Sequence, residues 1–212
     1  MIGWLKRLLH EADRFSIPRS ERPLPKCRFR PFCDDDFDNC LEIYRLNEPG
    51  RFPAAYAEYY SEWLRRRGDL VLICEAEGEI RAFGGISMNR QPQSEVAALT
   101  FGMVHPQYHN QGFGTGLLLA RIASLPPPSF HWVAFIATTG GSESYYKRFG
   151  FVHMDRWADE HGIEFDRYRA RIYKQEWQSC REGLAFASIA LDTSGIVVPP
   201  ISNLQNLIAK EN

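Results

Sequence analysis

The chain lacks a long apolar run, a cysteine pair with metal-ligand spacing and a net charge of any size. No apolar stretch approaches the ~20 residues that a membrane-spanning helix needs, and the N-terminus lacks the uninterrupted apolar segment of a signal peptide. The 5 cysteines include no Cys-x-x-Cys pair, which argues against a disulfide framework or a zinc site. The formal net charge is −1, which gives no general electrostatic reason to bind nucleic acid. We therefore expect a cytoplasmic protein with reduced thiols, no metal ion and no nucleic-acid partner.

Internal repeats and low-complexity segments are also missing from the 212 residues. This length is sufficient for one domain with a proper hydrophobic core, together with extensions at its ends. The search for function therefore turns to short motifs within a single domain.

Residues 1–16 have the apolar spacing of an amphipathic helix, with Leu5, Leu8 and Leu9 on one face. An apolar stripe on a short helix is the usual sign of packing, so we expect this helix to pack on its own domain or on a dimer mate. A helix that lies on a membrane surface is the weaker alternative. A linker rich in proline and arginine follows over residues 17–25.

The most informative segment is a glycine-rich corner between an apolar strand and an apolar helix. The run at residues 96–104 predicts a buried strand, and a helical apolar pattern begins at Leu117. Between them, residues 111–116 read Gln-Gly-Phe-Gly-Thr-Gly. The first N–H groups of a helix have no partner inside it and lie at the positive end of the helix dipole. Because glycines let an anion approach the backbone, this corner predicts a phosphate-binding site.

Two common phosphate-binding motifs do not fit this corner. A Walker loop requires Lys and then Ser or Thr after its last glycine, where this chain has two leucines. The dinucleotide motif G-x-G-x-x-G requires a glycine where this chain has Leu117 or Leu119. The pattern that fits is Gln-x-x-Gly-x-Gly, at Gln111, Gly114 and Gly116.

This pattern resembles the CoA-binding loop of the GNAT superfamily of acyl-CoA-dependent N-acetyltransferases. The preceding Val-His-Pro at residues 104–106 also resembles the end of the fourth strand in that family. A second match follows at Tyr146, Gly150 and Phe151, which fit the family's Tyr-x-x-x-Gly-Phe. The resemblance extends over approximately residues 28–173, and its motifs are specific in combination rather than singly.

The resemblance implies an α/β (α+β) fold with a mixed, mostly antiparallel central sheet flanked by helices. Three parts are expected: an N-terminal helix and linker (1–25), an acyltransferase domain (26–174) and a C-terminal extension (175–212). The periodicity of the sequence agrees with the family order β-α-α-β-β-β-α-β-α-β-β. The expected strands cover residues 27–32, 69–76, 79–88, 96–104, 131–137, 151–157 and 164–173. The expected helices begin near residues 34, 53 and 117 and cover residues 142–149 and 177–190.

Three consecutive aspartates, Asp34, Asp35 and Asp36, stand where the first of these helices should begin. The helix dipole favours acidic groups at that position, and three consecutive acids on a helix start cannot converge on one ion. We therefore interpret them as a helix cap and not as a metal site.

Glycines also occur at a turn and inside a strand of the expected sheet. Glu77 and Gly78 predict a short hairpin turn between two strands. Gly84 and Gly85 lie inside the second of these strands, which predicts a β-bulge or a close approach of another part of the chain.

The helix expected from Pro53 carries four aromatic side chains at helical spacing. In GNAT proteins the first two helices flank the acceptor site, so the resemblance implies that these rings could select an apolar or cationic amine by cation–π contact. Packing in the core is the simpler interpretation and the one that we favour. The four residues are Tyr56, Tyr59, Tyr60 and Trp63.

The resemblance implies direct transfer of an acetyl or other short acyl group to an amine, with acetyl-CoA or another acyl-CoA as co-substrate. The strand edge at Met103 and Val104 would pair with the pantetheine arm. Tyr146 would be the general acid that protonates the leaving thiolate, whereas Tyr145 points about 100° away on the helix and is expected to pack. The residues implied to hold the pyrophosphate are Gln111, Gly112, Phe113, Gly114, Thr115 and Gly116.

The general base is the part of the mechanism that the sequence does not identify. Many family members carry a carboxylate on the fourth strand, and residues 96–103 contain no acid. Glu95 is a weak candidate, and a surface role is the better interpretation of His105 and His109. A water chain from Thr100, or an acceptor that arrives uncharged, remains open.

A non-catalytic acyl-CoA-binding module, acting as a sensor or partner-binding protein, is the alternative function. The strand without an acid and the terminal segments without a family counterpart favour it. For an enzyme, the acceptor could be a small-molecule or a peptide amine, because this fold hosts many substrates. A homodimer is compatible with the sequence, and membrane contact through residues 1–16 is not expected.

Overall fold

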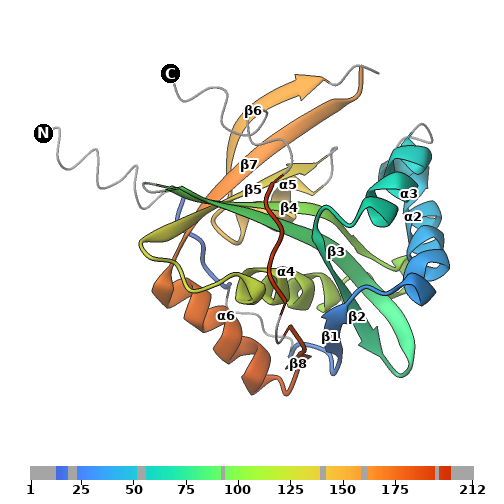
Figure 1. The fold of residues 1–212 in the computed structure, drawn as a ribbon, viewed down its shortest axis with the longest axis horizontal. Helices are drawn as coiled ribbons and strands as arrows, with labels where there is room; N and C mark the ends of the chain where they lie inside the picture. Colours follow the sequence, from blue (N-terminus) through green and yellow to red (C-terminus); the bar gives the residue numbers. More distant parts are fainter. Residues whose placement is uncertain are drawn as a thin grey trace, which may run out of the picture.

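The computed structural model describes residues 13–18, 23–51, 56–91, 94–138, 142–158, 162–193 and 196–201. Its strands form a sheet in the order β6-β7-β5-β4-β3-β2-β1-β8 (Figure 1). The strands are β1 (Arg28–Pro31), β2 (Leu70–Ala76), β3 (Glu79–Gln91), β4 (Ser94–Val104), β5 (His131–Thr138), β6 (Val152–Ala158), β7 (Glu164–Tyr173) and β8 (Ala190–Leu191). The helices are α2 (Phe37–Arg51), α3 (Tyr56–Arg66), α4 (Phe113–Ser124), α5 (Glu143–Lys147) and α6 (Lys174–Phe186).

Antiparallel pairing dominates this sheet. The parallel pairs are β4 with β5 and β1 with β8, and the other neighbouring strands run antiparallel. From β1 to β7 the elements follow the order expected from the sequence. The prediction of a mixed, mostly antiparallel sheet flanked by helices is therefore confirmed.

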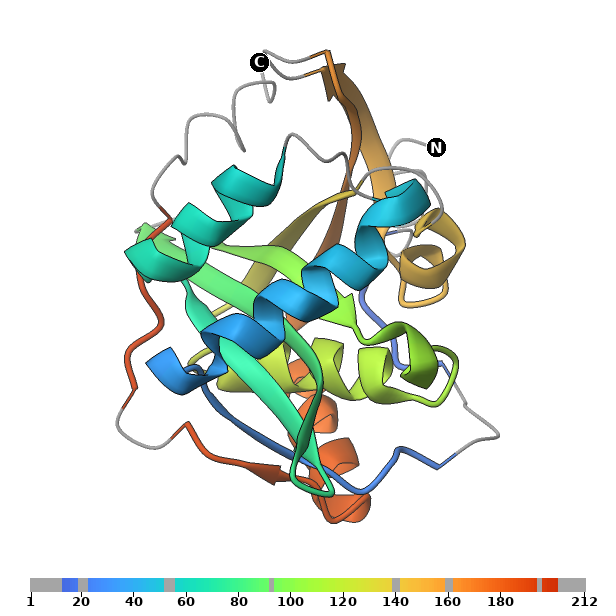
Figure 2. The same cartoon turned by 90° about the vertical axis from the view of Figure 1, so that its right-hand side faces the viewer.

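Helices cover both faces of the sheet. Figure 2 looks onto the face that carries α2 and α3, and Figure 1 places α4 and α6 on the opposite side. Under α2 and α3 lies a buried cluster that includes Tyr44, Tyr60 and Phe83. A second cluster, which includes Leu118 and Trp132, lies between the sheet and α4. None of the described helices is long and apolar enough to cross a membrane.

Helix α4 is buried almost all round, because it lies between the sheet and α6. Its apolar sequence explains this position, since a helix without a polar face must be covered on every side. Arg121 is the charged residue of this otherwise apolar helix, and it is nevertheless buried, with an exposure of only 2%.

The glycines of the sheet have the roles predicted for them. Glu77 and Gly78 form the β2–β3 turn with φ values of 54° and 80°. Gly84 lies where the register between β3 and β4 shifts, between Phe83 and Gly85. The predicted hairpin and the predicted bulge are both confirmed.

Asp36 contributes to the helix cap that the sequence predicted, as the third residue of a 3-10 turn (Asp34–Asp36) whose N-cap is Cys33. Its carboxylate accepts the N–H of Cys33 at 2.8 Å and two hydrogen bonds from the Arg30 guanidinium at 2.7 and 2.8 Å. Burial acts to raise the pKa of Asp36, but the hydrogen bonds from Arg30 and Cys33 outweigh it and hold the pKa below its ordinary value.

The N-terminal helix prediction is wrong at residues 13–16, and residues 1–12 lie outside the described part of the chain. Arg14 forms a parallel bridge with Arg171, and the Phe15 N–H donates to the Arg171 carbonyl at 2.8 Å. The Phe15 ring is 1% exposed and stacks on Phe149 at 6.1 Å between centroids. Pairing with β7 therefore overrides the helical spacing of this segment.

The C-terminal segment packs against the domain. Helix α6 begins earlier than predicted and stops at Phe186 instead of continuing to residue 190. Its end is a tight turn in which Ser188 has φ 55° and the Ile189 N–H donates to the Leu184 carbonyl. Beyond β8, the Met88 N–H of β3 donates to the Pro199 carbonyl at 2.8 Å. The predicted helix length is therefore wrong, and packing accounts for the described part of this segment.

Candidate active site

Strands β4 and β5 separate in the middle of the sheet. Their parallel pairing runs from Glu95 opposite Trp132 to Leu99 opposite Ile136 and stops there. Immediately afterwards β4 bulges, because Gly85 pairs with Thr100 but Phe83 pairs with Met103. Phe101 in this bulge has φ 40°, a strained value for a residue other than glycine. The bulge and the separation together leave an unpaired edge on the second half of β4.

Val104 presents main-chain groups to this unpaired edge. Met103 lies opposite Phe83 in the ladder, and the His105 N–H donates to the Arg81 carbonyl at 2.8 Å. Main-chain groups alternate in direction along a strand, so those of Val104 face away from β3. The Val104 carbonyl already accepts a hydrogen bond from Asn47 at 3.0 Å, so its N–H is the group that remains toward the gap.

The glycine corner begins helix α4 as the sequence predicted. Gly112 is the N-cap with φ 92°, and a Cβ there would lie 3.0 Å from Pro25. The Gly116 N–H donates to the Gly112 carbonyl at 2.9 Å, which is the first intrahelical bond. The N–H groups of Phe113, Gly114 and Thr115 precede it and have no carbonyl one turn earlier within the helix. This end of α4 therefore offers adjacent donors to an anion.

The side chains of the corner have different surroundings from its backbone. Gln111 is exposed and donates to the Gln107 carbonyl at 2.9 Å. Phe113 is buried and packs edge-on against Tyr108 at 5.8 Å. A Cβ on Gly114 would be in ordinary contact with Val104 at 3.5 Å. The corner and the free edge of β4 are therefore adjacent.

The two tyrosines of α5 occupy different environments. Tyr145 packs against Phe149 at 5.2 Å, as predicted, and its buried hydroxyl has no hydrogen-bond partner among the described residues. Burial raises the pKa of Tyr145 above its ordinary value. Tyr146 is half-buried and contacts the rings of Tyr145 at 4.9 Å and Phe151 at 5.6 Å. Both side chains are half-buried, and the buried hydroxyl of Tyr145 is what distinguishes the two.

Arg121 places an unpaired cation on the α4 face of the bulge. Its Nη1 lies 3.5 Å from the Thr100 carbonyl, a long contact, and its buried Nε has no partner in the described chain. The guanidinium has room only because two neighbours are glycines. A Cβ on Gly84 would lie 3.2 Å from Arg121, and a Cβ on Gly102 would lie 2.8 Å from it.

Asp69 was not identified from the sequence, yet it lies at the opposite face of the same bulge. Its Oδ2 accepts hydrogen bonds from the Trp63 indole at 2.9 Å and from the Thr100 hydroxyl. A Cβ on Gly85 would lie 2.6 Å from Trp63 and 3.0 Å from Asp69. The Gly84-Gly85 pair was the one sequence signal of this close approach.

The other candidate bases lie elsewhere or are already engaged. Glu95 is 8% exposed, accepts the Ser129 N–H at 2.8 Å and lies at the far end of β4 from the bulge. His105 accepts the Gln107 N–H at 3.3 Å. His109 Nε2 lies 3.0 Å from the Val104 carbonyl, beside the free edge of β4.

The aromatic stripe of α3 divides into a core part and an open part. Tyr60 is fully buried and stacks on Tyr44 at 4.5 Å. Trp63 contacts Phe101 of the bulge at 4.7 Å, and Tyr59 contacts the same ring at 6.0 Å while remaining 55% exposed. Core packing therefore accounts for Tyr60, and the other rings form an aromatic wall next to the bulge.

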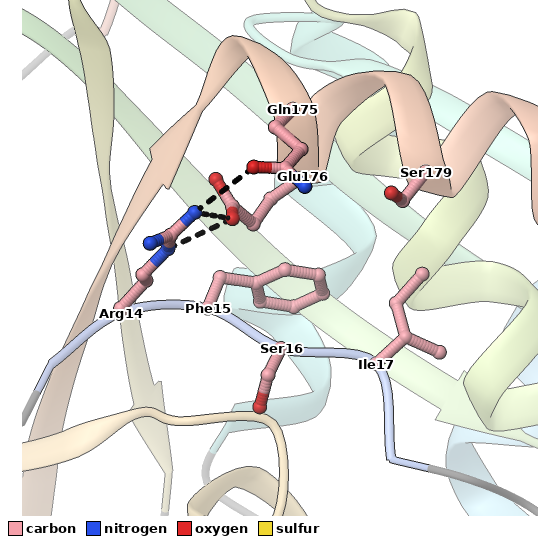
Figure 3. Close-up of a pocket in the computed structure, with 7 residues that line it drawn as sticks. All are labelled: Arg14, Phe15, Ser16, Ile17, Gln175, Glu176 and Ser179. Atoms are coloured by element: carbon pink, nitrogen blue, oxygen red, sulfur yellow. Dashed lines mark hydrogen bonds and ion pairs between the residues drawn. The ribbon is translucent and has the colours of Figure 1, made fainter. Parts of the chain in front are cut away.

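A separate pocket lies between the N-terminal segment and α6 (Figure 3). It has a volume of about 410 Å³, and Arg14 on its wall is paired with Glu176. It has no lining residue in common with the glycine corner, the bulge or α5. We therefore do not include it in the candidate active site.

Comparison with known proteins identifies the class. The family model described as "Acetyltransferase (GNAT) family" matches residues 37–151, which include the bulge, the glycine corner and α5. The chain therefore belongs to the GNAT acetyltransferase family. A comparison with curated proteins found no match.

Solved structures agree on the fold. A GNAT-family protein from Desulfovibrio desulfuricans has a TM-score of 0.54 and 16% identity, and the match covers 68% of this chain and 97% of that chain. Ribosomal-protein-alanine N-acetyltransferase from Brucella melitensis gives 0.50 and 19%, covering 66% and 97%. N-acetylglutamate synthase from Neisseria gonorrhoeae, complexed with coenzyme A and N-acetyl-glutamate, gives 0.50 and 16%, covering 70% and 36%.

Proposed function

We propose that this protein transfers an acetyl or other short acyl group from acyl-CoA to an amine by direct attack. The observation that carries the proposal is the start of α4, whose free N–H groups lie beside the unpaired edge of β4. A helix N-terminus that opens with glycines is suited to a pyrophosphate. An unpaired strand edge is suited to the amides of a pantetheine arm. The CoA-bound synthase from Neisseria supports the same co-substrate here.

Each part of the site has a proposed role. The N–H groups from Gly112 to Thr115 hold the pyrophosphate, with Gln111 and Phe113 shaping the loop and Gly116 closing it through its hydrogen bond to the Gly112 carbonyl. The Val104 N–H pairs with the pantetheine arm, and Met103 holds the strand by pairing with Phe83.

Tyr146 is the proposed general acid. A phenol is a suitable proton donor to a leaving thiolate. Tyr146 fits the family motif, whereas the Tyr145 hydroxyl is buried and its ring packs against Phe149.

The non-catalytic alternative rested on the absence of an acid from residues 96–103 and on the terminal segments without a family counterpart. Glu95 lies at the far end of β4 from the bulge, but Asp69, from outside the strand, is in hydrogen-bond contact with Thr100. A carboxylate is therefore available at the bulge, which favours the catalytic proposal.

Calorimetric titration with acetyl-CoA and with CoA tests the proposal directly. Gly114→Trp should abolish binding, because the Cβ position is already in contact with Val104 and leaves no room for an indole beside the loop. Gln178→Trp, on an exposed position of α6, is the matched control and should bind as the wild type does. Absence of both binding heat and a thermal shift with either ligand would mean that the corner is only a turn.

A further inference from the structure

Asp69 is a half-buried carboxylate that no basic side chain neutralises within the described part of the chain. The three arginines that precede it point elsewhere: Arg65 lies over the Phe37 ring, Arg66 pairs with Glu62, and Arg67 pairs with Asp34. Arg121, the cation at the bulge, lies against Gly84 and Gly102 on the opposite face of the sheet. The partners of Asp69 are the neutral donors of Trp63 and Thr100. A carboxylate in this setting keeps the capacity to receive a proton or a cation.

Thr100 connects this carboxylate to the place where the sheet opens. It is the first residue of β4 beyond the last β4–β5 pair, at Leu99 and Ile136. Its hydroxyl donates to Asp69 and retains lone pairs that can accept from another donor. The arrangement is held tightly, because a Cβ on Gly85 would collide with Trp63. Thr100 therefore lies at the edge of the gap between β4 and β5, where a group that enters from the α3 face would contact it.

The surroundings of Thr100 are suited to an ammonium group. The Phe101 ring lies between two others, with its centroid 4.7 Å from that of Trp63 and 6.0 Å from that of Tyr59. Aromatic faces attract cations, and a nearby carboxylate strengthens that preference. Together these groups match a protonated amine with an apolar or aromatic substituent.

We propose that Asp69, acting through the Thr100 hydroxyl, is the base that deprotonates the acceptor amine. This inference rests on the proposed acyl transfer, since it assigns the one role that the sequence left open. Thr100 touches the acceptor, and Asp69 acts through Thr100.

The reaction then uses the hydrogen bonds of Thr100 and Asp69 for the following proton transfers. An N–H bond of the ammonium breaks and its proton passes to the Thr100 oxygen, while the Thr100 proton passes to Asp69. The freed nitrogen lone pair forms the C–N bond with the thioester carbonyl, and the C–S bond breaks to release CoA thiolate. Tyr146, the proposed acid, protonates the thiolate. The second proton of the attacking nitrogen is lost to solvent as the C–S bond breaks and the amide forms. Solvent then returns a proton to Tyr146 and removes one from Asp69, so the enzyme regains its starting state and one proton is released for each amide formed.

The test compares two acceptors that differ in whether they carry a proton to be removed. 2-Phenylethylamine is protonated at neutral pH, whereas hydroxylamine is uncharged and needs no base before it attacks. CoA release from acetyl-CoA is measured with a thiol reagent for wild type and Asp69→Asn. We expect Asp69→Asn to lower kcat/KM for 2-phenylethylamine about 100-fold, at the lower end of general-base contributions. The rate with hydroxylamine and the calorimetric Kd for acetyl-CoA should change by less than about threefold.

Substitutions of Thr100 provide a second part of the test. Thr100→Val removes the hydroxyl that links acceptor and carboxylate and should reproduce the selective loss, whereas Thr100→Ser keeps the hydroxyl and should restore most of the rate. Glu62→Gln removes an exposed carboxylate from α3 and should leave both rates unchanged. This control separates a local effect from a general loss of negative charge.

The outcomes are distinguishable. Equal losses for both acceptors in Asp69→Asn, or no loss for either, would overturn the role of Asp69 while leaving acyl transfer intact. A wild type that binds acetyl-CoA but does not acetylate 2-phenylethylamine would overturn the acceptor class and the inference with it. A wild type that binds neither acetyl-CoA nor CoA would instead overturn the proposed function.

Discussion

Two groups of charged side chains on the same sheet differ in whether each charge has an opposite charge in contact with it. At the start of β1 and α2, Arg30 is shared between Asp36 and Glu75, and each charge has an opposite charge in contact. At the bulge of β4, Asp69 and Arg121 lie on opposite faces and neither has an ionic partner in the described chain. Paired charges of the first kind hold elements together, whereas isolated charges are costly to bury. A charge that is kept despite this cost can have another use, which supports our proposal that the bulge belongs to the active site.

The largest effect that we expect comes from filling the glycine position beside Asp69. Gly85→Ala would force Thr100, Trp63 or Asp69 to move, because the new Cβ would collide with the Thr100 hydroxyl and lie 2.6 Å from the Trp63 ring. Overpacking of this kind should lower the free energy of unfolding by about 3 kcal/mol.

Gly84→Ala is the matched control for Gly85→Ala on the other face of the bulge. Its Cβ would meet Arg121 at 3.2 Å and the Gly102 backbone at 3.1 Å, and the flexible arginine can give way. We expect a loss of about 1 kcal/mol. Urea denaturation of both variants measures the difference, and equal losses would show that the two faces are not packed differently.

The next effect concerns the two tyrosines beside the bulge. Tyr146→Phe removes the proposed acid and should lower kcat about 100-fold while leaving the Kd for acetyl-CoA unchanged. Tyr145→Phe removes a buried hydroxyl without a partner, so turnover should persist and stability should stay equal or rise slightly. Steady-state kinetics and calorimetry compare them, and a wild-type rate in Tyr146→Phe would remove that residue from the mechanism.

The paired region should respond to acid. The pKa of Asp36 is lowered by Arg30 and Cys33 against the effect of burial. The ionised carboxylate therefore stabilises the fold fully above its ordinary pKa of 3.8, and this contribution is lost as the pH falls through the lower folded value. Arg30→Met should cost about 2 kcal/mol at neutral pH and flatten the loss of stability below about pH 4.

Arg67→Met is the control for Arg30→Met. Its partner Asp34 has a side chain that is 88% exposed, so the pair should contribute less than about 0.5 kcal/mol. Thermal melts from pH 3 to pH 7 provide the comparison. A steep acid transition that survives in Arg30→Met would assign it to other carboxylates.

The smallest effect, and the one of opposite sign, is expected at Arg121. Arg121→Met replaces an unpaired buried cation by an apolar chain of similar length and should stabilise the protein by about 1 kcal/mol. Arg45→Met, at an exposed position of α2, should leave the melting temperature unchanged. A destabilised Arg121→Met would mean that the guanidinium holds the bulge in place. Arg121 would then stabilise the fold in the same way as the paired charges around Arg30.

The parts that the sequence predicted correctly are the local ones. The glycine corner, the β2–β3 turn and the order of elements depend on residues close together in the chain, and their spacing is visible in the sequence. The contact between Asp69 and Thr100 joins residues 31 positions apart. Whether such residues meet depends on the sheet register and on a bulge, and neither follows from periodicity.

One incorrect expectation, at Phe15, and one residue that the sequence analysis did not single out, Arg121, have a related cause. The apolar side chain of Phe15 is compatible with a helix and with a strand, and the hydrogen bond from its N–H to the Arg171 carbonyl of β7 selects the extended conformation. Arg121 resembles an ordinary cation near a helix end, and its burial depends on glycines 84 and 102 in two other strands. In both cases the deciding neighbour is distant in the chain.

The position of β8 has a consequence for the order in which the protein can be completed. During synthesis, residues 190–201 leave the ribosome after all the other described strands, yet Val198 is 4% exposed in the main core and Pro199 covers β3 at Met88. Until they emerge, the outer edge of β1 and part of the core around α4 stay open to solvent and to other nascent chains. The sheet is therefore complete only when this last segment has left the ribosome and packed in place.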